Sequence, residues 1–460
     1  MTRSALQVGL LSGLVVLGAV LLEAYNTVDY DVAYLTWGAH AVAGGAVYGV
    51  DVLDINPPLC LLVYMPAALL ADAVGFEWGV RLAMLGLSLL SLACFWHTAE
   101  TPVRPAVGTV FVAFLLLAYP NHFAQREQIA FLLCAPYVAG PARRRGWAIA
   151  SGAMAGIGFL MKPHFLIPLA LLLALRRQFR NEERSMLAVA AAYAVVLAIL
   201  FRPYLLVMLP AARATYWAVA LPWRENAVQA GFVLLAALPL AAAGAQRGSI
   251  PYLLAALGFT AAAVLQGKGF YYHYIAGFGF LAMFLAASLN GGSRLIAACA
   301  ATLLVMEAIF LARLMQPWFA LQARTAADRQ AIQRQIDGSA SFISLAIQPG
   351  IAFPAVIHTG ARYLGLSSCQ GYMSAVEQYA TGKASGDPAP AYRLALDQAK
   401  RELLRRPELV LVAQYGQDNA AWDMLGWYQR DAGFRELWKD YRRDRSVGPV
   451  TLYRRSAAAP

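Results

Sequence analysis

Long apolar runs separated by short polar segments fill the first two thirds of the chain. A helix needs about 20 mainly apolar residues to cross a bilayer, and a number of these runs approach that length. We therefore predict an all-α polytopic membrane protein with transmembrane helices. The runs lie at residues 5–23, 58–74, 79–96, 105–119, 128–140, 147–161, 164–175, 185–201, 227–245, 250–265, 271–289 and 294–313.

The composition supports this class. Of the 460 residues, 60% are hydrophobic and only 14% are charged, whereas soluble domains carry about 25% charged residues. The net charge of +11 fits cytoplasmic loops and anionic membrane lipids better than nucleic acid. The five cysteines show no metal-binding or disulfide spacing, and we expect the first apolar run to be a retained span and not a cleaved signal peptide.

Basic clusters predict the orientation of the helices. Such clusters favour the cytoplasmic side of a membrane, and all of them share that side if every run except 58–74 crosses. This gives about eleven spans, with the N-terminus in the cytoplasm and the C-terminus outside. We expect run 58–74, which opens at Pro57 and Pro58, to lie on the outer surface as an interfacial helix. The clusters are Arg3, Arg104, Arg143 to Arg145, Arg176, Arg177, Arg180, Arg184, Arg247 and Arg294.

The pattern changes after residue 313. Amphipathic segments 323–337 and 391–406 predict helices, and segments 352–358, 407–415 and 447–455 predict strands. Such a mixture indicates a small α/β domain. We therefore divide the chain into a transmembrane domain, residues 1–313, and an extracytoplasmic domain, residues 314–460. The transmembrane domain includes an outer loop, residues 24–78, with juxtamembrane helices.

The predicted topology collects most of the remaining polar residues on outward loops. Asp29 and Asp31 follow the first span and precede a predicted short helix, 32–45. A carboxylate at this place can act as a general base toward an acceptor hydroxyl. The alternative is a solvated loop or a helix cap. For Asp29 we favour the helix cap, and it also stays a candidate substrate-binding residue. For Asp31 we favour the catalytic role.

The second outward loop ends in Arg126 and Glu127. Glu127 has the chemistry to hold a divalent ion or to orient the acceptor, and Arg126 has the geometry to bind a phosphate with two hydrogen bonds. Both interpretations compete with a simple ion pair in which the two side chains neutralise each other.

Two further outward turns carry cations and imidazoles. Lys162 and His164 interrupt an apolar stretch, and Pro163 between them ends the helix. Lys268 and His273, with Tyr272, occupy the turn before the tenth span. Lysines at these depths either face a polar cavity or extend to the interface, and an interfacial belt is the alternative interpretation of the aromatic residues. Together these turns suit a phosphate or pyrophosphate leaving group.

Asn56 and Arg202 complete the candidate substrate-binding residues. Asn56 ends the polar part of the first outer loop, where it either orders the loop or lines the cavity. Arg202 opens the long loop 202–226, whose aromatic residues either stack on a sugar or anchor to lipid headgroups.

Several of these segments together resemble the GT-C superfamily of membrane glycosyltransferases, with the aminoarabinose transferase and protein O-mannosyltransferase type as the nearest relatives in pattern. The resemblance covers about residues 1–290. Two departures concern the first loop, where Asp29-Tyr30-Asp31 replaces Asp-Glu or Asp-Asp, and Asn56 replaces a lysine. The segments are DYDVAYL, GGAVYGVDVLDINPPL, AQREQIAFLL, GFLMKPH and GKGFYYHY.

The resemblance implies an inverting transfer of a sugar from a polyprenyl-phosphate donor to a lipid, glycan or protein acceptor. It places the protein in the bacterial inner membrane, with the C-terminal domain in the periplasm. Asp31 would be the general base and Glu127 the acid of the second outer loop. Lys162 and Lys268 would lie near the donor phosphate. A divalent cation, Mg²⁺ or Mn²⁺, held by Asp31 and Glu127 is compatible with these residues but not required.

A transporter or flippase of a lipid-linked or anionic substrate is the alternative. It would use the same charges along a substrate path, but such proteins are commonly built from repeated halves with matched interrupted helices. The sequence shows no such repeat, and the charges gather on one side of the membrane. No Walker, GxGxxG, HExxH or nucleophile-elbow motif is present either. We therefore favour the glycosyltransferase.

Overall fold

The structure is a computed structural model of the 460-residue chain. It describes residues 27–98, 107–108, 122–176, 178–219, 223–243, 247–289, 293–353, 355–416 and 420–456. The described residues form two compact units. Unit 1 comprises the described parts of Asn56–Leu200 and Ala220–Trp318. Unit 2 comprises those of Val28–Ile55, Phe201–Val219 and Phe319–Pro460.

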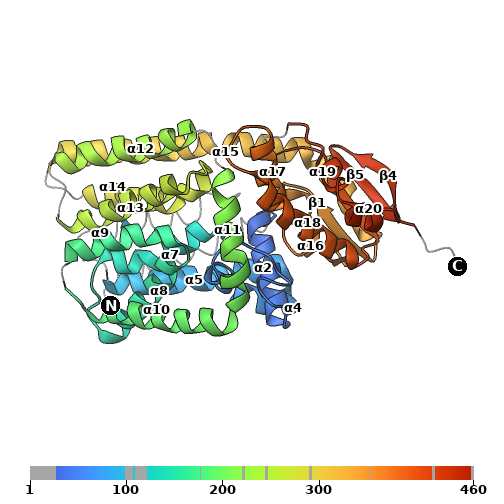
Figure 1. The fold of residues 1–460 in the computed structure, drawn as a ribbon. Helices are drawn as coiled ribbons and strands as arrows, with labels where there is room; N and C mark the ends of the chain where they lie inside the picture. The colour runs from blue at the N-terminus through green and yellow to red at the C-terminus, as the bar shows by residue number, and fades with distance from the viewer. Residues whose placement is uncertain are drawn as a thin grey trace. The chain divides into compact units, whose positions relative to one another are not determined.

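Unit 1 is a bundle of helices, several of which lie side by side (Figure 1). Short 3-10 turns at Pro163–Phe165, Arg247–Ser249 and Tyr271–Tyr274 join some of them. The helices are α3 (Pro58–Leu62), α4 (Met65–Val74), α5 (Phe76–Thr98), α7 (Arg126–Ala139), α8 (Arg145–Leu160), α9 (Leu166–Arg176), α10 (Asn181–Leu200), α12 (Trp223–Ala242), α13 (Ile250–Gln266), α14 (Ile275–Ser288) and the first part of α15 (Arg294–Asp337).

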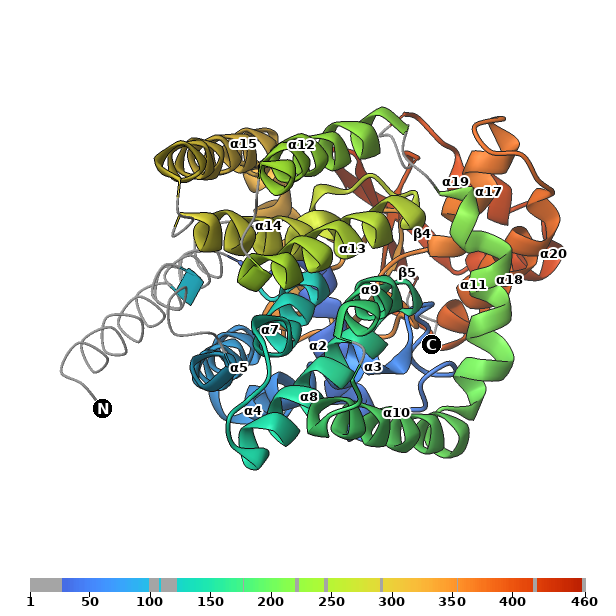
Figure 2. The ribbon, with the colours of Figure 1, turned by 90° about the vertical axis from the view of Figure 1, so that its left-hand side faces the viewer.

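The core of unit 1 surrounds α14, every residue of which is buried. Phe280 of α14 meets Phe259 of α13 in a stacked arrangement at 5.5 Å between ring centroids, and Phe131 of α7 edge-on at 5.0 Å. Phe159 of α8 stacks on Phe259 at 6.1 Å. Figure 2 shows α7, α8, α13 and α14 gathered together. Because aromatic pairs in such geometries add to the energy of burial, this layer holds four helices together.

Small residues allow the helices of unit 1 to approach closely. A Cβ atom added to Gly258 of α13 would lie 2.5 Å from Cα of Pro168 in α9. A Cβ atom added to Gly277 of α14 would lie 2.7 Å from Oγ1 of Thr260 in α13. Close contact through small residues is the usual packing mode of helices in membranes, where water does not drive helices together.

Large apolar side chains cover the outer faces of several helices in unit 1. Examples are Ile199 of α10 (70% exposed), Leu235 of α12 (76%) and Leu295 of α15 (73%). Within the described ranges, three helices are long and apolar enough to cross a membrane: Phe76–Thr98, Asn181–Leu200 and Arg294–Leu314. Exposed apolar belts on such helices are typical of a multi-pass membrane protein.

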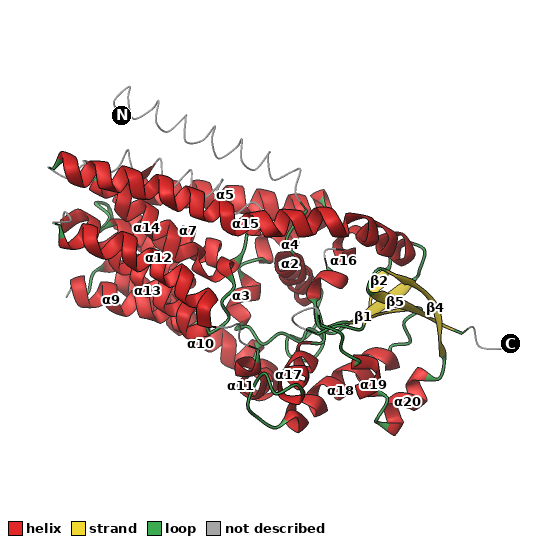
Figure 3. Ribbon diagram, turned by 90° about the horizontal axis from the view of Figure 1, so that it is seen from above, coloured by secondary structure: helices red, strands yellow, loops and turns green. Residues whose placement is uncertain are grey.

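Unit 2 combines a sheet with short helices. Its helical elements are α2 (Tyr30–Ala43), a π-helical turn (Tyr204–Met208), α11 (Leu209–Thr215), the remainder of α15, α16 (Ala355–His358), α17 (Gly371–Ala380), α18 (Pro388–Leu404), α19 (Met424–Tyr428) and α20 (Ala432–Trp438). Its strands are β1 (Ser341–Leu345), β2 (Arg362–Tyr363), β3 (Leu409–Ala413), β4 (Tyr441–Val447) and β5 (Val450–Arg455). Figure 3 shows the strands in yellow with α18, α19 and α20 beside them.

The five strands form a mixed sheet in the order β2-β1-β3-β5-β4. β1 runs parallel to β2 and β3, while β5 pairs antiparallel with β3 and β4. β3 is buried along its whole length, as expected for a central strand that is covered on both faces. The predicted small α/β domain is thus present as a C-terminal mixed sheet with helices.

The predicted helices of the first two thirds are confirmed wherever the structure describes them. The run 5–23 and most of 105–119 lie outside the described residues. Run 58–74 forms two short helices, α3 and α4, and the Lys162-Pro163-His164 turn separates α8 from α9 as expected. The number of spans, their orientation, the interfacial placement of 58–74 and the division at residue 313 remain predictions.

One strand prediction for unit 2 is wrong. Residues 355–358 of the segment 352–358 form helix α16 instead. A short apolar run is compatible with either a strand or a buried helical turn, so its pattern alone does not separate them. The strands predicted in 407–415 and 447–455 are confirmed as β3 and β5, and the helix predicted at 391–406 as α18.

Candidate functional site

The turn before α7 sets the direction of Glu127. Ala124 takes a left-handed backbone conformation with a φ of 65°, which is uncommon for alanine. Two contacts hold it there: Tyr64 Oη donates to the carbonyl of Ala124 at 2.7 Å, and the Ala124 amide donates to Gln128 Oε1 at 2.7 Å. The chain then enters α7 at Arg126, which leaves Glu127 in the first helical turn with 0% of its surface exposed.

Lys162 forms a buried ion pair with Glu127. Its Nζ atom contacts Glu127 Oε1, lies 3.4 Å from Gln266 Oε1, and stands 5.7 Å from the ring centroid of Phe165. Lys162 is only 5% exposed. Since Pro163 ends the helical path immediately after Lys162, the break in the chain places the ammonium group inside the bundle and not on its lipid-facing side.

The turn between α13 and α14 brings two more groups to this cluster. Gly267 and Gly269 both have a φ of 65°, a conformation that glycine adopts without strain. The turn leaves Lys268 9% exposed and His273 6% exposed. His273 Nε2 lies 4.0 Å from Glu127 Oε1, so the residues of three separate turns meet around one carboxylate.

The charges of this cluster do not balance. Three cations (Arg126, Lys162 and Lys268) oppose one carboxylate (Glu127), which leaves a formal charge of +2 on side chains that are all at most 9% exposed. Burial lowers the pKa of Lys268 to about 8, so it still carries its charge at pH 7. A buried surplus of positive charge is costly in the absence of an anion, and a phosphate ligand would offset it.

The imidazoles of the cluster act differently from the lysines. Burial, together with the charge of Lys162, lowers the pKa of His164 to about 3. His164 is therefore neutral at physiological pH and would contact a phosphate as a hydrogen-bond donor. The neighbouring lysine disfavours a second positive charge at this position, and the role of His164 at the donor phosphate stays a prediction.

Several polar atoms in the cluster have no hydrogen-bond partner among the described residues. They are Glu127 Oε2, His273 Nδ1 and His164 Nε2, all buried. Buried polar atoms are normally paired. These three are therefore positioned to bind water or a ligand.

Unit 2 holds Asp29 and Asp31, the two acidic residues at the start of the predicted first outer loop. Asp29 is the N-cap of α2, and its Oδ1 accepts from the Asp31 amide at 2.9 Å, so the capping interpretation is confirmed. Asp31 lies in the first turn of α2 and is partly exposed. Burial and then the charges of Asp31 and Asp54 raise the pKa of Cys369 to about 12, which shows that both carboxylates lie near this thiol.

The other candidates have different environments. Tyr272 is 8% exposed and lies edge-on to His273 at 4.4 Å between ring centroids. Asn56 begins unit 1 and is partly buried, whereas Arg202 is exposed in unit 2. In the part of the chain that the structure describes, no three His, Cys, Asp or Glu side chains form a metal-binding group. A divalent cation therefore remains a prediction.

Sequence reasoning missed two polar members of the unit 1 cluster. Gln266 contacts Lys162 and is 2% exposed; a lone glutamine at the end of an apolar helix gives little signal. His122 is 2% exposed, bonds through Nε2 to Tyr271 Oη at 2.7 Å, and lies 5.1 Å from the ring of Tyr272. It lies in the same predicted loop as Glu127, but no motif or spacing in the sequence distinguishes it from its neighbours as a site residue.

The fold can be compared with solved structures. It matches the crystal structure of ArnT from Cupriavidus metallidurans bound to undecaprenyl phosphate, with a TM-score of 0.55 over 97% of this chain and 99% of that chain. The chain has the ArnT fold. The fold that the sequence resemblance implies is thereby confirmed.

The ArnT fold is shared at a sequence identity of 12%. At that distance the match establishes architecture and not chemistry. No family model matches the sequence, and no curated protein matches it either. What the site does must therefore be argued from its own residues.

Proposed function

We propose that the protein is a membrane glycosyltransferase that takes a sugar from a polyprenyl-phosphate donor. The observation that carries this proposal is the buried cluster of three cations and one carboxylate around Lys162 and Glu127. Its surplus positive charge suits a phosphate, and the ArnT structure, which shares the fold, is bound to undecaprenyl phosphate.

In this proposal the cluster receives the donor phosphate. Lys268 and Arg126 add positive charge beside the pair of Lys162 and Glu127. His164 and His273 offer buried imidazole nitrogens without partners in the described structure. When the bond between the anomeric carbon and the phosphate oxygen breaks, the electron pair stays on the phosphate. Fixed cations that already face this group stabilise the growing charge without reorganisation.

Asp31 is the general base in this scheme. It would take the proton of the acceptor hydroxyl as that oxygen attacks the anomeric carbon from the face opposite the phosphate, which inverts the configuration. Asp29 supports this role, because its cap on the Asp31 amide fixes the start of α2. Asp54 and Cys369 lie near Asp31, and the weakly acidic thiol adds no charge to the site.

A comparison of two lipids tests the phosphate site. The full-length protein in detergent should bind undecaprenyl phosphate more tightly than undecaprenol, which lacks the anion. Lys268→Gln should reduce this preference at least about fivefold, since one cation near an anionic group contributes about that factor. The matched control is Lys439→Gln, a lysine exposed in unit 2. Equal affinity for both lipids, or an equal loss in the control, would remove the phosphate site.

Labelling of single cysteines tests the proposed orientation. Asp51→Cys lies at a partly exposed position and Pro163→Cys at an exposed position of two predicted outward loops, and Gly146→Cys lies at the exposed start of α8. In intact cells an impermeant maleimide should label positions 51 and 163 and leave position 146 unlabelled. Labelling of positions 51 and 163 from opposite sides would contradict an active site assembled from these loops.

The flippase alternative is separated by turnover. A glycosyltransferase must convert the donor to undecaprenyl phosphate in the presence of an acceptor, whereas a flippase moves the intact donor across a bilayer. Vesicles that contain the purified protein distinguish the two, because the lipid product and the sidedness of the donor are measured in the same sample.

A further inference from the structure

Segment 364–370, which joins β2 to α17 in unit 2, links α18 to loop 44–55, the loop that follows α2. The amide of Leu53 in this loop donates to the carbonyl of Leu366 at 2.6 Å. The amide of Leu366 in turn donates to Oε1 of Glu402, a residue of α18, at 2.9 Å. Both backbone groups of Leu366 are therefore used, and Glu402 holds Leu53 through this residue.

The same loop residue is bonded to helix α2, which carries Asp31. Tyr34 lies one helical turn after Asp31, and its hydroxyl donates to the carbonyl of Leu53 at 2.8 Å. Tyr34, Leu53 and Leu366 are all buried, so their hydrogen bonds are shielded from water and are costly to break. Three hydrogen bonds thus lead from Glu402 to α2. We call this chain of bonds the Glu402 relay.

The carboxylate of Glu402 is buried among hydrogen-bond donors. Besides the Leu366 amide, Nε2 of Gln398 donates to its Oε1 at 3.0 Å and Nε2 of Gln370 donates to its Oε2 at 2.8 Å. Gln370 is itself held by the Tyr428 hydroxyl, which donates to its Oε1 at 2.8 Å. A charged carboxylate accepts all three N–H groups, whereas a protonated one presents an O–H donor to them and loosens the arrangement.

The end of α18 also contacts loop 44–55 directly. Arg401 donates to the carbonyl of Val50 at 2.6 Å, and the guanidinium group of Arg405, which follows α18, lies 3.6 Å from Oδ1 of Asp51. These contacts are partly exposed to solvent, where ion pairs contribute little. The buried link through Glu402 is therefore the contact that fixes the loop against α18.

Glu402 changes its charge near neutral pH. Burial raises its pKa to about 7, against the opposing effect of its hydrogen bonds and of the positive charge of Arg405. The other titratable groups around it are Tyr363, Cys369 and Tyr428, and burial raises the pKa of each of them as well. These three groups stay neutral near pH 7, so the charge of Glu402 is the one that varies there.

We propose that Glu402 is a positioning residue for the general base Asp31, and that its ionised carboxylate holds the first turns of α2 in place through the Glu402 relay. This inference rests on the proposed glycosyltransferase. Glu402 does not touch the substrate but acts through Leu366, Leu53 and Tyr34. Because the charged form accepts every bond of the set, protonation of Glu402 loosens the relay and lowers turnover.

Hydrogen exchange of the full-length protein tests the relay without a substrate. At pH 8, Glu402→Gln should raise the exchange rates of peptides that cover residues 47–55 and 364–370 at least about tenfold, since a hydrogen bond to a charged group is worth about that factor. At pH 6 the difference from the wild type should shrink, because Glu402 is then protonated. Peptides that cover β3 should exchange at the wild-type rate. Unchanged exchange of both segments at pH 8 overturns the relay.

Turnover of an undecaprenyl-phosphate sugar tests the consequence for the reaction. In the wild type, kcat should fall as the pH decreases below about 7. Glu402→Gln should lower kcat at pH 8 at least about tenfold and leave KM for the donor unchanged, because small displacements of a catalytic group have effects of this size. The fall near pH 7 should be absent from this variant. The matched control is Glu377→Gln, which replaces another buried carboxylate of unit 2 and should keep both kcat and the fall.

A second variant separates the relay from misfolding. Tyr34→Phe removes only the hydroxyl at the end of the relay, and it should also lower kcat and abolish the fall near pH 7. Since both residues act through one chain of bonds, Tyr34→Phe/Glu402→Gln should lose no more kcat than the larger single loss. Multiplied losses in the double variant, or a wild-type pH profile in either single variant, overturn the proposal. A wild type without any turnover refutes the glycosyltransferase instead, and hydrogen exchange then decides whether Glu402 holds the loop.

Discussion

Replacement of Glu127 by glutamine tests how much this carboxylate stabilises the buried cations of the unit 1 cluster. The Glu127 carboxylate is fully buried beside the ammonium group of Lys162, and the charge of Arg126 also acts on it. Two unit charges 4 Å apart interact by about 4 kcal/mol at an effective dielectric constant of about 20. Glu127→Gln changes the formal charge of the cluster from +2 to +3, and it should therefore destabilise the protein by about 3–5 kcal/mol.

The double variant Glu127→Gln/Lys162→Met separates charge from packing. It restores the formal charge of the cluster to +2 and removes the lysine that would otherwise lose its carboxylate partner. The double variant should therefore unfold at a clearly higher temperature than Glu127→Gln alone. A ligand gives the second signature. Undecaprenyl phosphate would supply the missing anion, so its affinity for Glu127→Gln should exceed that for the wild type at least about fivefold.

The assay uses the cysteines of the chain. Cys60, Cys94 and Cys134 are buried, and Cys134 lies on the same helix as Glu127. A maleimide dye that fluoresces on reaction with thiols therefore reports unfolding, once the exposed Cys299 and the partly exposed Cys369 are replaced by serine. If the single and double variants unfold at the same temperature, or if undecaprenyl phosphate stabilises Glu127→Gln no more than the wild type, the charge argument is refuted.

Three further predictions concern charge, packing and capping. Burial lowers the pKa of Lys268 to about 8, and the side chain is charged below that pKa. The affinity for undecaprenyl phosphate, measured from pH 7 to 9.5, should therefore fall above pH 8. Lys268→Arg should remove this fall, and an unchanged pH dependence in Lys268→Arg would exclude Lys268 as its cause. Gly258→Ala places a Cβ atom 2.5 Å from Pro168 and should lower the free energy of unfolding by about 1–3 kcal/mol. The control Gly231→Ala meets no atom within 4 Å and should not destabilise the protein. Asp29→Ala should lower the free energy of unfolding by about 1 kcal/mol, because it removes the cap of α2. Asp29→Asn should be close to the wild type in stability. Equal destabilisation by the two variants would show that the cap is not the cause.

The sequence predicted the helices well because membrane helices have a strong local signal. Runs such as 250–265 and 185–201 agree with α13 and α10 within a few residues. The turn at Lys162 was also predictable, since a proline and two polar residues interrupt an apolar stretch. These features depend on residues that are near one another in the chain.

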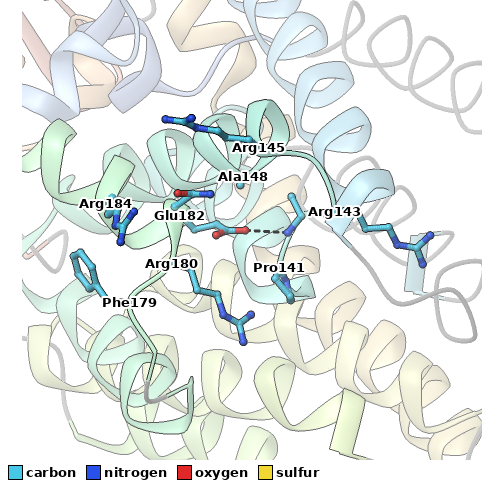
Figure 4. Close-up of a pocket in the computed structure, with 10 residues that line it drawn as sticks. Pro141, Arg143, Arg145, Ala148, Phe179, Arg180, Glu182 and Arg184 are labelled. Atoms are coloured by element: carbon cyan, nitrogen blue, oxygen red, sulfur yellow. Dashed lines mark hydrogen bonds between the residues drawn. The ribbon is translucent and has the colours of Figure 1, made fainter.

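The contacts that complete the site depend on distant residues and were not predictable in the same way. Nothing in the sequence indicates that Lys162 pairs with Glu127, 35 positions away, or that Gln266 also lies beside Lys162. The arginines at the connection between α9 and α10 show the same limit. The sequence groups Arg176, Arg180 and Arg184 as one cytoplasmic cluster, yet the structure buries Arg176 against Glu183 and leaves Arg180 and Arg184 at the lining of a pocket (Figure 4).

The most direct test of the account is turnover of lipid-linked sugars. The purified full-length protein is incubated with undecaprenyl-phosphate pentoses and hexoses and with a membrane extract as the source of acceptor, and release of undecaprenyl phosphate is measured. We predict release with at least one donor, loss of release in Asp31→Asn, and unchanged binding of undecaprenyl phosphate by that variant. Release that persists at the wild-type rate in Asp31→Asn, or a donor that crosses the bilayer of vesicles without being cleaved, would contradict the proposed enzyme.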